Sequence, residues 1–94
     1  MMEFLIGSFA LSKAGRDSDK PYVIFHIDNE YVYLVDGIIR TIDRPKKKKK
    51  KHVVMLDQFD TFLADKVKNN TAKNEEIKRA LKLLQSGNSS KEVE

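Results

Sequence analysis

The residues best suited to chemistry in this 94-residue chain are six consecutive lysines, Lys46–Lys51. Lysine ammonium groups are compact, hydrated charges that suit phosphate oxygens, whereas arginine favours the bidentate reading of base edges. Arg40 and Arg44 precede the run and His52 follows it, so basic residues continue on both sides. The run therefore predicts contacts with the phosphates of a polyanion, which supply affinity but no choice of sequence.

The excess positive charge of the chain lies entirely in this run. The formal net charge is +4, from 18 basic and 14 acidic residues. Because six of the basic residues belong to the run, the other 12 are outnumbered by the 14 acidic ones. A basic stripe on a weakly acidic body predicts a single docking place for an anionic partner, with nucleic acid as the first candidate.

Runs of like charge also occur in proteins as solvated, self-repelling loops and as nuclear-import signals. An acidic membrane surface would attract the same charge, but no basic amphipathic helix or lipidation motif accompanies it. The run stands in mid-chain between two apolar segments that should form strands. We therefore expect a folded scaffold to hold the lysines, which lowers the cost of ordering them at a partner.

No other constellation in the sequence suggests catalysis or metal binding. The chain has no cysteine, and its two histidines, His26 and His52, lack the spacing of metal ligands. We expect His26 to be a hydrogen-bonded structural residue and His52 to extend the basic stripe. With 34% charged residues and no catalytic motif, we expect no enzyme, no catalytic residue, no cofactor and no metal. The absence of cysteine also suits a cytoplasmic location.

The segment from Phe4 to Leu56 has the composition of a small antiparallel sheet. Turn residues interrupt β-branched and aromatic stretches about every eight to ten residues. Asp28-Asn29-Glu30 predicts one hairpin turn and Asp36-Gly37 predicts another, of type I′. The expected strands are Phe4–Ser12, Pro21–Ile27, Tyr31–Val35, Ile38–Ile42 and His52–Leu56.

Two of these expected strands carry apolar residues on both alternating faces. This pattern holds in 21–27 and in 31–35, so both faces should be covered and the sheet should curl into a small barrel. The tyrosines within it, Tyr22, Tyr31 and Tyr33, could stack on unpaired bases. We favour a place in the core or its cover for them. The apolar start of the chain is interpreted as a strand, with a signal peptide as the alternative.

The last third of the chain changes to helical periodicity. A helix is predicted in NEEIKRALKLLQSG, with Asn74 as N-cap and Gly87 at the C′ position. Its apolar face consists of Ile77, Ala80, Leu81 and Leu84. A further helical turn or two is expected within Leu56–Val67, with Phe59, Phe62 and Leu63 on one side. NNTAK should be a linker and SSKEVE should fray.

Part of the sequence resembles a known family. The segment IGSFALSKAGRDSDKPYVIFHIDNEYVYLVDG resembles the KOW motif region of the fourteenth large-subunit ribosomal protein of archaea and eukaryotes. Residues 4–56, including VDGIIRTIDRPKKKKKKH, are more similar still to small bacterial KOW-domain RNA-binding proteins. Three blocks carry the match: Lys13 to Asp17, Asp36-Gly37, and Pro45 to His52.

The resemblance implies an SH3-like barrel whose KOW loop and basic segment meet ribosomal or other structured RNA. It assigns Lys13, Gly15, Arg16 and Lys20 to the KOW loop. The lysine run becomes the RNA-facing basic segment. Family members often have glycine where this chain has Asp19, whose carboxylate would repel phosphate at that corner of the loop.

We therefore expect a mainly β fold, with a five-stranded SH3-like barrel in residues 1–56 and a helical extension in residues 57–94. The expected function is RNA binding by a monomeric, non-catalytic protein associated with the ribosome or with another structured RNA. The alternative is a protein-interaction adaptor that uses the barrel and the Ile77, Leu81 and Leu84 face. The candidate RNA contacts are Lys13, Gly15, Arg16, Lys20, Arg40, Arg44, Lys46, Lys47, Lys48, Lys49, Lys50, Lys51 and His52.

Overall fold

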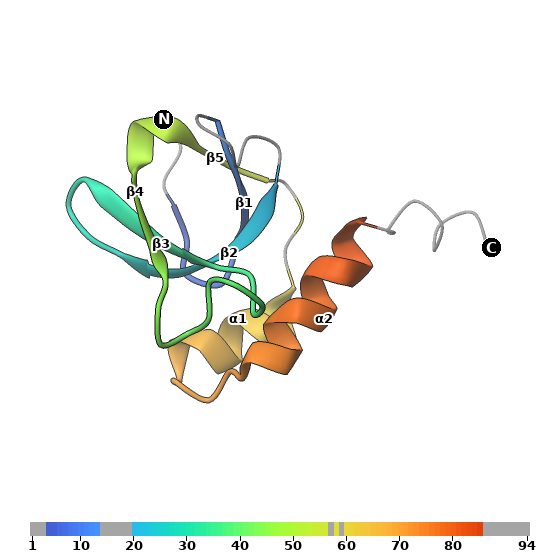
Figure 1. The fold of residues 1–94 in the computed structure, drawn as a ribbon. Helices are drawn as coiled ribbons and strands as arrows, with labels where there is room; N and C mark the ends of the chain where they lie inside the picture. The colour runs from blue at the N-terminus through green and yellow to red at the C-terminus, as the bar shows by residue number, and fades with distance from the viewer. Residues whose placement is uncertain (1–3, 14–19, 57, 59, 86–94) are drawn as a thin grey trace.

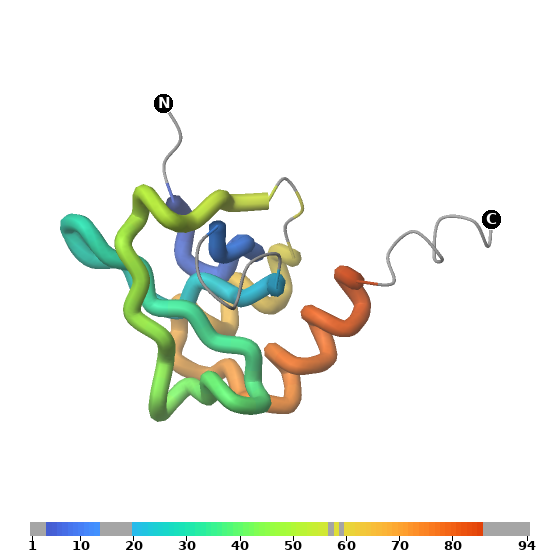
Figure 2. Tube along the Cα trace, turned by 45° about the horizontal axis from the view of Figure 1, so that its top comes forward, coloured from blue at the N-terminus to red at the C-terminus, as the bar shows by residue number. Residues whose placement is uncertain are grey.

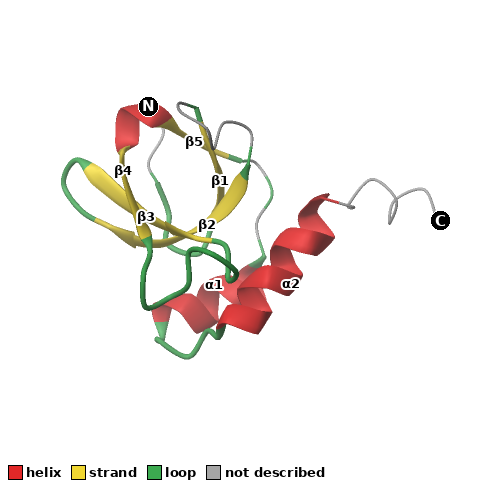
Figure 3. Ribbon diagram, in the orientation of Figure 1, coloured by secondary structure: helices red, strands yellow, loops and turns green. Residues whose placement is uncertain are grey.

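The computed structural model describes residues 4–13, 20–56, 58 and 60–85 (Figure 1). Within them the chain forms a five-stranded antiparallel sheet followed by two α-helices, as Figure 3 shows by colour. The elements are β1 Phe9–Ser12, β2 Pro21–Ile27, β3 Tyr31–Val35, β4 Lys46–Lys49, the 3₁₀-helix η2 Lys50–His52, β5 Val53–Met55, α1 Thr61–Lys68 and α2 Asn74–Gln85. The predicted antiparallel sheet with a C-terminal helix is thus confirmed.

The sheet is strongly curved, and the reason lies in its connections. The strand order is β4-β3-β2-β1-β5, so β4 and β5 lie at opposite ends of the sheet. In a flat sheet these ends would stand about 19 Å apart, at about 4.8 Å per neighbouring pair. Only η2 links them, and the four steps from Lys49 to Val53 reach at most about 14 Å. The sheet must therefore bend to bring its two ends together, as Figures 1 and 2 show.

The first strand is shorter than predicted. It begins at Phe9 and not at Phe4, because residues 5–8 form a turn in which the Ser8 N–H donates to the Leu5 carbonyl at 3.1 Å. Gly7 has φ 89°, a conformation that suits glycine alone. The turn brings this segment against α1, where a Cβ on Gly7 would lie 2.5 Å from the Ala64 Cα.

The prediction of a fourth strand at Ile38–Ile42 is wrong. The fourth strand is the lysine run itself, β4, and Ile38 and Ile39 are 64% and 71% exposed in the loop before it. The Asp36 carboxylate accepts hydrogen bonds from backbone N–H groups of this loop, which removes them from any strand ladder. Gly37 has the expected positive φ of 80°, but Asp36 does not, so no type I′ turn forms.

Each face of the sheet carries its own apolar cluster. One face lines the inside of the curve with Ala10, Tyr22, Ile24, Val32, Leu34 and Val53. The opposite face packs under the helices and contributes to a cluster of Phe9, Val23, Val35, Leu63, Val67, Ala72, Ile77, Ala80 and Leu81. The prediction that the central strands are covered on both faces is confirmed at Val23 and Val35, which lie under the helices, but not at the tip of the β2–β3 hairpin, where the outer face is partly exposed. The expected boundary at residue 56 falls between β5 and α1, and the second cluster draws residues from both sides of it.

The C-terminal helix packs against the sheet, as its apolar face predicts. Ile77 and Leu81 are only 0% and 7% exposed, and Leu84 packs on the same cluster. These are the side chains that the adaptor alternative assigned to a partner, and they are already covered by the rest of the chain. Asn74 is the first helical residue and not the N-cap, since its Oδ1 accepts from the Ile42 N–H at 2.9 Å. The predicted C′ residue, Gly87, and the expected frayed end lie outside the described residues.

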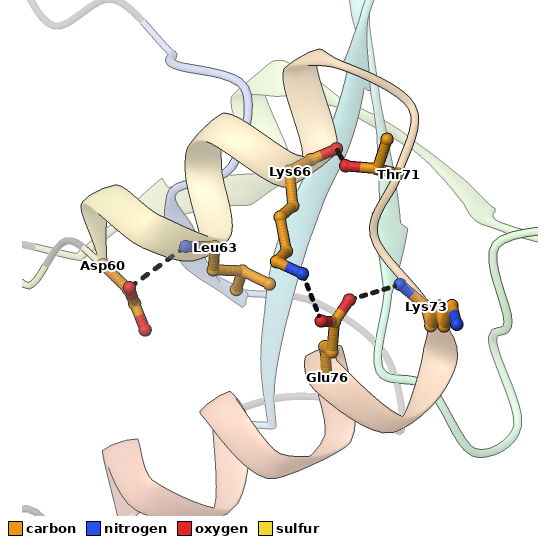
Figure 4. Close-up of polar contacts among 6 residues, drawn as sticks. All are labelled: Asp60, Leu63, Lys66, Thr71, Lys73 and Glu76. Atoms are coloured by element: carbon orange, nitrogen blue, oxygen red, sulfur yellow. Dashed lines mark hydrogen bonds and ion pairs between the residues drawn. The ribbon is translucent and has the colours of Figure 1, made fainter.

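Polar contacts fix α1 against the start of α2 (Figure 4). Asp60 caps α1 by accepting from the Leu63 N–H at 3.1 Å. Glu76 accepts from the Lys66 ammonium at 2.7 Å and from the Lys73 N–H at 2.9 Å. The hydrogen bond from Lys66 and that from Lys73 lower the pKa of Glu76. The two helices are therefore held together at the end of α2 that faces the β3–β4 loop.

The linker predicted at NNTAK closes α1 with a Schellman motif. Asn70 has φ 61°, and its N–H donates to Val67, while the Thr71 N–H donates to the Lys66 carbonyl. On α1 itself Phe62 is 74% exposed, so it does not share the buried side of Leu63 as predicted. Phe59 lies outside the described residues.

Within the described part of the chain, no helix has both the length and the apolar character needed to span a bilayer.

Replacing Gly7 with alanine should destabilise the fold by about 2–4 kcal/mol, because alanine is strained at this φ and its Cβ would press on the α1 backbone. Urea unfolding monitored by circular dichroism measures the loss. Leu5→Ala in the same turn is the control, since Leu5 is 49% exposed and should lose less than about 1 kcal/mol. Equal losses in the two variants would contradict the proposed close packing at Gly7.

Candidate functional site

The lysine run is held in the sheet by regular pairing with β3. Lysine is under-represented in strands, so the strand conformation of the run depends on its hydrogen-bonded pairing with β3. The antiparallel register pairs Tyr31 with Lys49, Val32 with Lys48, Tyr33 with Lys47 and Leu34 with Lys46. Because opposite residues share a face, the four lysines of β4 divide into two sets.

Lys46 and Lys48 lie on the face of the buried residues Leu34 and Val32, and both are partly buried. Burial lowers the pKa of Lys46, and the charge of Lys48 lowers it further. A lysine can lay its methylene stem on an apolar surface while its ammonium group stays in water. β4 can thus cover the rim of the inner cluster without any apolar residue of its own.

Lys47 and Lys49 lie on the opposite face and are exposed. The Lys47 ammonium stands over the Tyr31 ring at 4.4 Å from its centroid, a cation–π contact. The run then continues into η2, where the Lys50 N–H donates to the Glu30 carbonyl at 2.9 Å. This bond attaches η2 to the β2–β3 turn. A shallow hollow of about 340 Å³ lies between them, lined by Asn29, Glu30, Lys49, Lys50 and Lys51.

The far end of the run meets the start of the loop that the resemblance assigns to the KOW motif. The Lys13 N–H donates to the His52 carbonyl at 2.8 Å, and Ser12 pairs with Val53 in the sheet. Lys13 is exposed and His52 partly so. Residues singled out at distant positions of the sequence are therefore neighbours in the fold. Gly15 and Arg16 lie outside the described residues.

We define the lysine ridge as Lys46–Lys51 together with Lys13 and His52. The ridge follows β4 and η2 along one border of the sheet, and Lys13 adjoins its end. Arg44 is exposed just before it, in the loop that leads to β4. Most of the basic residues singled out from the sequence thus lie along one border of the sheet, with Lys46 and Lys48 on its inner face and Lys47 and Lys49 on its outer face.

Lys20 and Arg40 belong to a different cluster, around Asp36. The Lys20 ammonium forms an ion pair with Asp36 Oδ2 at 2.9 Å, and the hydrogen bond to Asp36 raises the pKa of Lys20. Arg40 is partly buried in the same loop, and its N–H donates to Asp36 Oδ1 at 2.8 Å. Lys20 therefore has a structural partner within the chain, Asp36. The prediction of Lys20 as an RNA contact did not include this ion pair.

Asp36 is the organising residue of the β3–β4 loop. It is 3% exposed, and its Oδ1 accepts from the N–H groups of Ile38, Ile39 and Arg40 at 2.9, 3.1 and 2.8 Å. Burial alone would raise the pKa of Asp36, but the Lys20 hydrogen bond and these backbone donors outweigh it and hold the pKa below its ordinary value. Sequence reasoning missed this role. Aspartate side chains often accept hydrogen bonds from the backbone N–H groups that follow them in a turn. The Asp36-Gly37 pair is the signal in this sequence that could have indicated such a turn.

The edge position of β4 accounts for part of the run without any binding partner. Exposed edge strands commonly carry lysine, because a charge there prevents pairing with another chain. One or two lysines meet that need, and Lys46 and Lys48 stand at the inner rim where they would serve it. The outward residues Lys47 and Lys49 and the η2 residues Lys50 and Lys51 are not required for it. These four lysines are therefore a stronger indication of a binding surface than Lys46 and Lys48.

Among the described residues, no group of three or more histidine and carboxylate side chains is placed to hold a metal ion. Comparison with protein-family models gives no match for this chain, and a search of curated proteins gives none either.

Replacing Asp36 with asparagine should lower the free energy of unfolding at pH 7 by about 1–3 kcal/mol, because the buried end of the Lys20 ion pair is removed. The lower part of this range is expected, since the Lys20 side chain is 40% exposed and screened by water. Chemical unfolding at several pH values provides the measurement. Asp43→Asn makes the same charge change on an exposed loop residue and should have little effect at pH 7.

The pH dependence gives the same prediction a second test. Because folding lowers the pKa of Asp36, the unfolded chain takes up the proton first as the pH falls. The contribution of Asp36 is therefore complete above its ordinary value of 3.8 and is lost as the pH falls through the lower, folded value. The difference between the wild type and Asp36→Asn should shrink in that acidic range. A difference that stays constant down to about pH 2 would contradict the assigned role.

Proposed function

We propose that this protein is a non-catalytic RNA-binding protein that holds RNA phosphates along the lysine ridge. The observation that carries the proposal is that the lysine run is a paired strand followed by a short 3₁₀-helix, and not an excursion from the fold. Its backbone is already ordered by β3 and by the Lys50–Glu30 hydrogen bond. Less conformational entropy is then lost when a polyanion binds.

We further propose that the sheet is an SH3-like barrel. The support is the curvature forced by η2 and the apolar cluster that fills the concave face. Both features agree with the fold that the KOW resemblance implies. In this proposal the loop between β1 and β2 is the KOW loop, and it begins at Lys13, beside His52.

The proposed mechanism is neutralisation of phosphates by closely spaced charges. Alternate residues of a strand are about 7 Å apart, so Lys47 and Lys49 lie within the Debye length of about 8 Å at physiological salt. Their fields add, and the ridge attracts a polyanion more strongly than separate lysines would. Such contacts fix the position of an RNA but read no base, so sequence choice must come from other groups.

The KOW resemblance suggests ribosomal or another structured RNA as the partner, and a role in translation. The adaptor alternative has less support, because Ile77 and Leu81 are buried in the chain's own core. A protein partner would have to use another surface.

Changing Lys47, Lys49 and Lys51 to glutamine should weaken RNA binding and reduce its dependence on salt. Each phosphate contact to a single strand contributes about 0.7 to the slope of log K against log salt, so three lost contacts should flatten the slope by about 2. Fluorescence anisotropy with a labelled RNA between about 50 and 300 mM salt measures both quantities. All three lysines are exposed, so the variant should fold normally.

A matched control changes Lys68, Lys73 and Lys78 to glutamine. These exposed lysines lie on or between the helices, and their replacement removes the same amount of charge. If the proposal is correct, this control should keep most of the wild-type slope. Equal flattening in the two variants would show that net charge, and not the lysine ridge, determines binding.

A further inference from the structure

Two tyrosines and a histidine lie side by side on the outer face of the β2–β3 hairpin tip. Tyr31 and Tyr33 are two residues apart on β3 and therefore point to the same side of the sheet. His26 pairs with Tyr33 across the hairpin, and their ring centroids are 5.4 Å apart with an interplanar angle of 49°. His26 is exposed and both tyrosines are partly exposed. We call these three residues the aromatic face.

The helices do not cover this part of the sheet. The next residue of the same face, Val35, belongs to the cluster under α1 and α2, but the tyrosines do not. Figures 1 and 2 show the hairpin tip projecting away from both helices. Tyr22, in contrast, is 1% exposed inside the curve of the sheet. The expectation that the tyrosines lie in the core or its cover is confirmed for Tyr22, whereas Tyr31 and Tyr33 are partly exposed on the outer face.

Two lysines border the aromatic face on one side. Lys47 and Lys49 pair with Tyr33 and Tyr31 and lie on the same side of the sheet. An aromatic surface bordered by cations matches the alternating base and phosphate of a single-stranded nucleic acid, in which each base offers a flat face. The charge complementarity therefore favours a nucleic acid strand as the occupant.

We propose that the aromatic face binds unpaired nucleotides of RNA, with bases stacked on Tyr31 and Tyr33 and the adjoining phosphates held by Lys47 and Lys49. This inference rests on the proposed function and deepens it, because it selects single-stranded segments over duplex. The bases of a duplex are stacked on one another, so their faces are not free to stack on the tyrosine rings. Proteins recognise double-stranded RNA chiefly through its shape and backbone.

A base can stack on Tyr31 only if the Lys47 side chain moves off that ring, and the position of Lys47 is compatible with such a move. Its ammonium now stands 4.4 Å from the centre of the Tyr31 ring. A cation–π contact at an exposed site is weaker than the stacking of a base on an aromatic ring. When RNA binds, the base takes the place over Tyr31 and the ammonium moves to the neighbouring phosphate. The contact in the free protein keeps the lysine close to where it is needed.

The test compares an unstructured oligouridine with a blunt RNA duplex of the same length. The double variant Tyr31→Leu/Tyr33→Leu should lose roughly 5- to 150-fold in affinity for the single strand per stacked base. Tyr31→Phe/Tyr33→Phe keeps both rings and should bind almost as the wild type does. Duplex binding should be similar in all three proteins. Circular dichroism checks that each variant is folded.

A second measurement does not depend on any variant. In the wild-type protein, stacking should shift the ring-proton NMR signals of Tyr31 and Tyr33 upfield on titration with oligouridine, while those of the buried Tyr22 should hardly move. Equal affinity for single strand and duplex, with unmoved Tyr31 and Tyr33 signals, would overturn this inference and leave the lysine ridge in place. Failure of the wild type to bind either RNA would overturn the proposed function as well.

Discussion

The placement of the lysine ridge depends on the Asp36 carboxylate. This side chain takes up three backbone N–H groups in the loop after β3 and forms an ion pair with Lys20 at the start of β2. A segment whose N–H groups are already bonded to a side chain cannot add to the sheet. The isoleucines that follow are therefore left in the loop, and the border of β3 stays open for the next segment of the chain. That segment is the lysine run.

Most of the fold follows from patterns that are local in the sequence. The alternating apolar residues of β2 and β3, the polar turn Asp28-Asn29-Glu30 between them and the helical period around Ile77 each indicate their own structure. Two apolar sets on one strand pair also correctly predict an apolar cluster on each face, although the outer face stays open at the hairpin tip. Local patterns could not predict that the lysine run, and not Ile38–Ile42, forms the fourth strand. β-branched residues favour strands and lysines do not, so here the hydrogen bonds to Asp36 and the pairing of the lysines with β3 outweigh the local preferences.

The candidate site was predictable in composition but not in arrangement. The run and its basic neighbours are visible in the sequence, whereas the contact of Lys13 with His52 depends on how the sheet curves. The pairing of Lys20 with Asp36 joins residues from different strands, and no spacing rule indicates it. Prediction of the aromatic face would have required the register of β3 and the extent of the sheet that the helices cover. Tyr22 and Tyr33 look equivalent in sequence, and only the three-dimensional fold separates them.

Neighbouring lysines along β4 also make the strand sensitive to its ionic surroundings. Like charges on adjacent positions of one face repel each other, and dissolved ions weaken this repulsion. The same ions compete with the protein for a polyanion. Salt should thus stabilise β4 in the free protein and weaken the nucleic-acid binding proposed above. A polyanion bound as proposed and the dissolved ions would be alternative counterions for the same mutually repelling lysines.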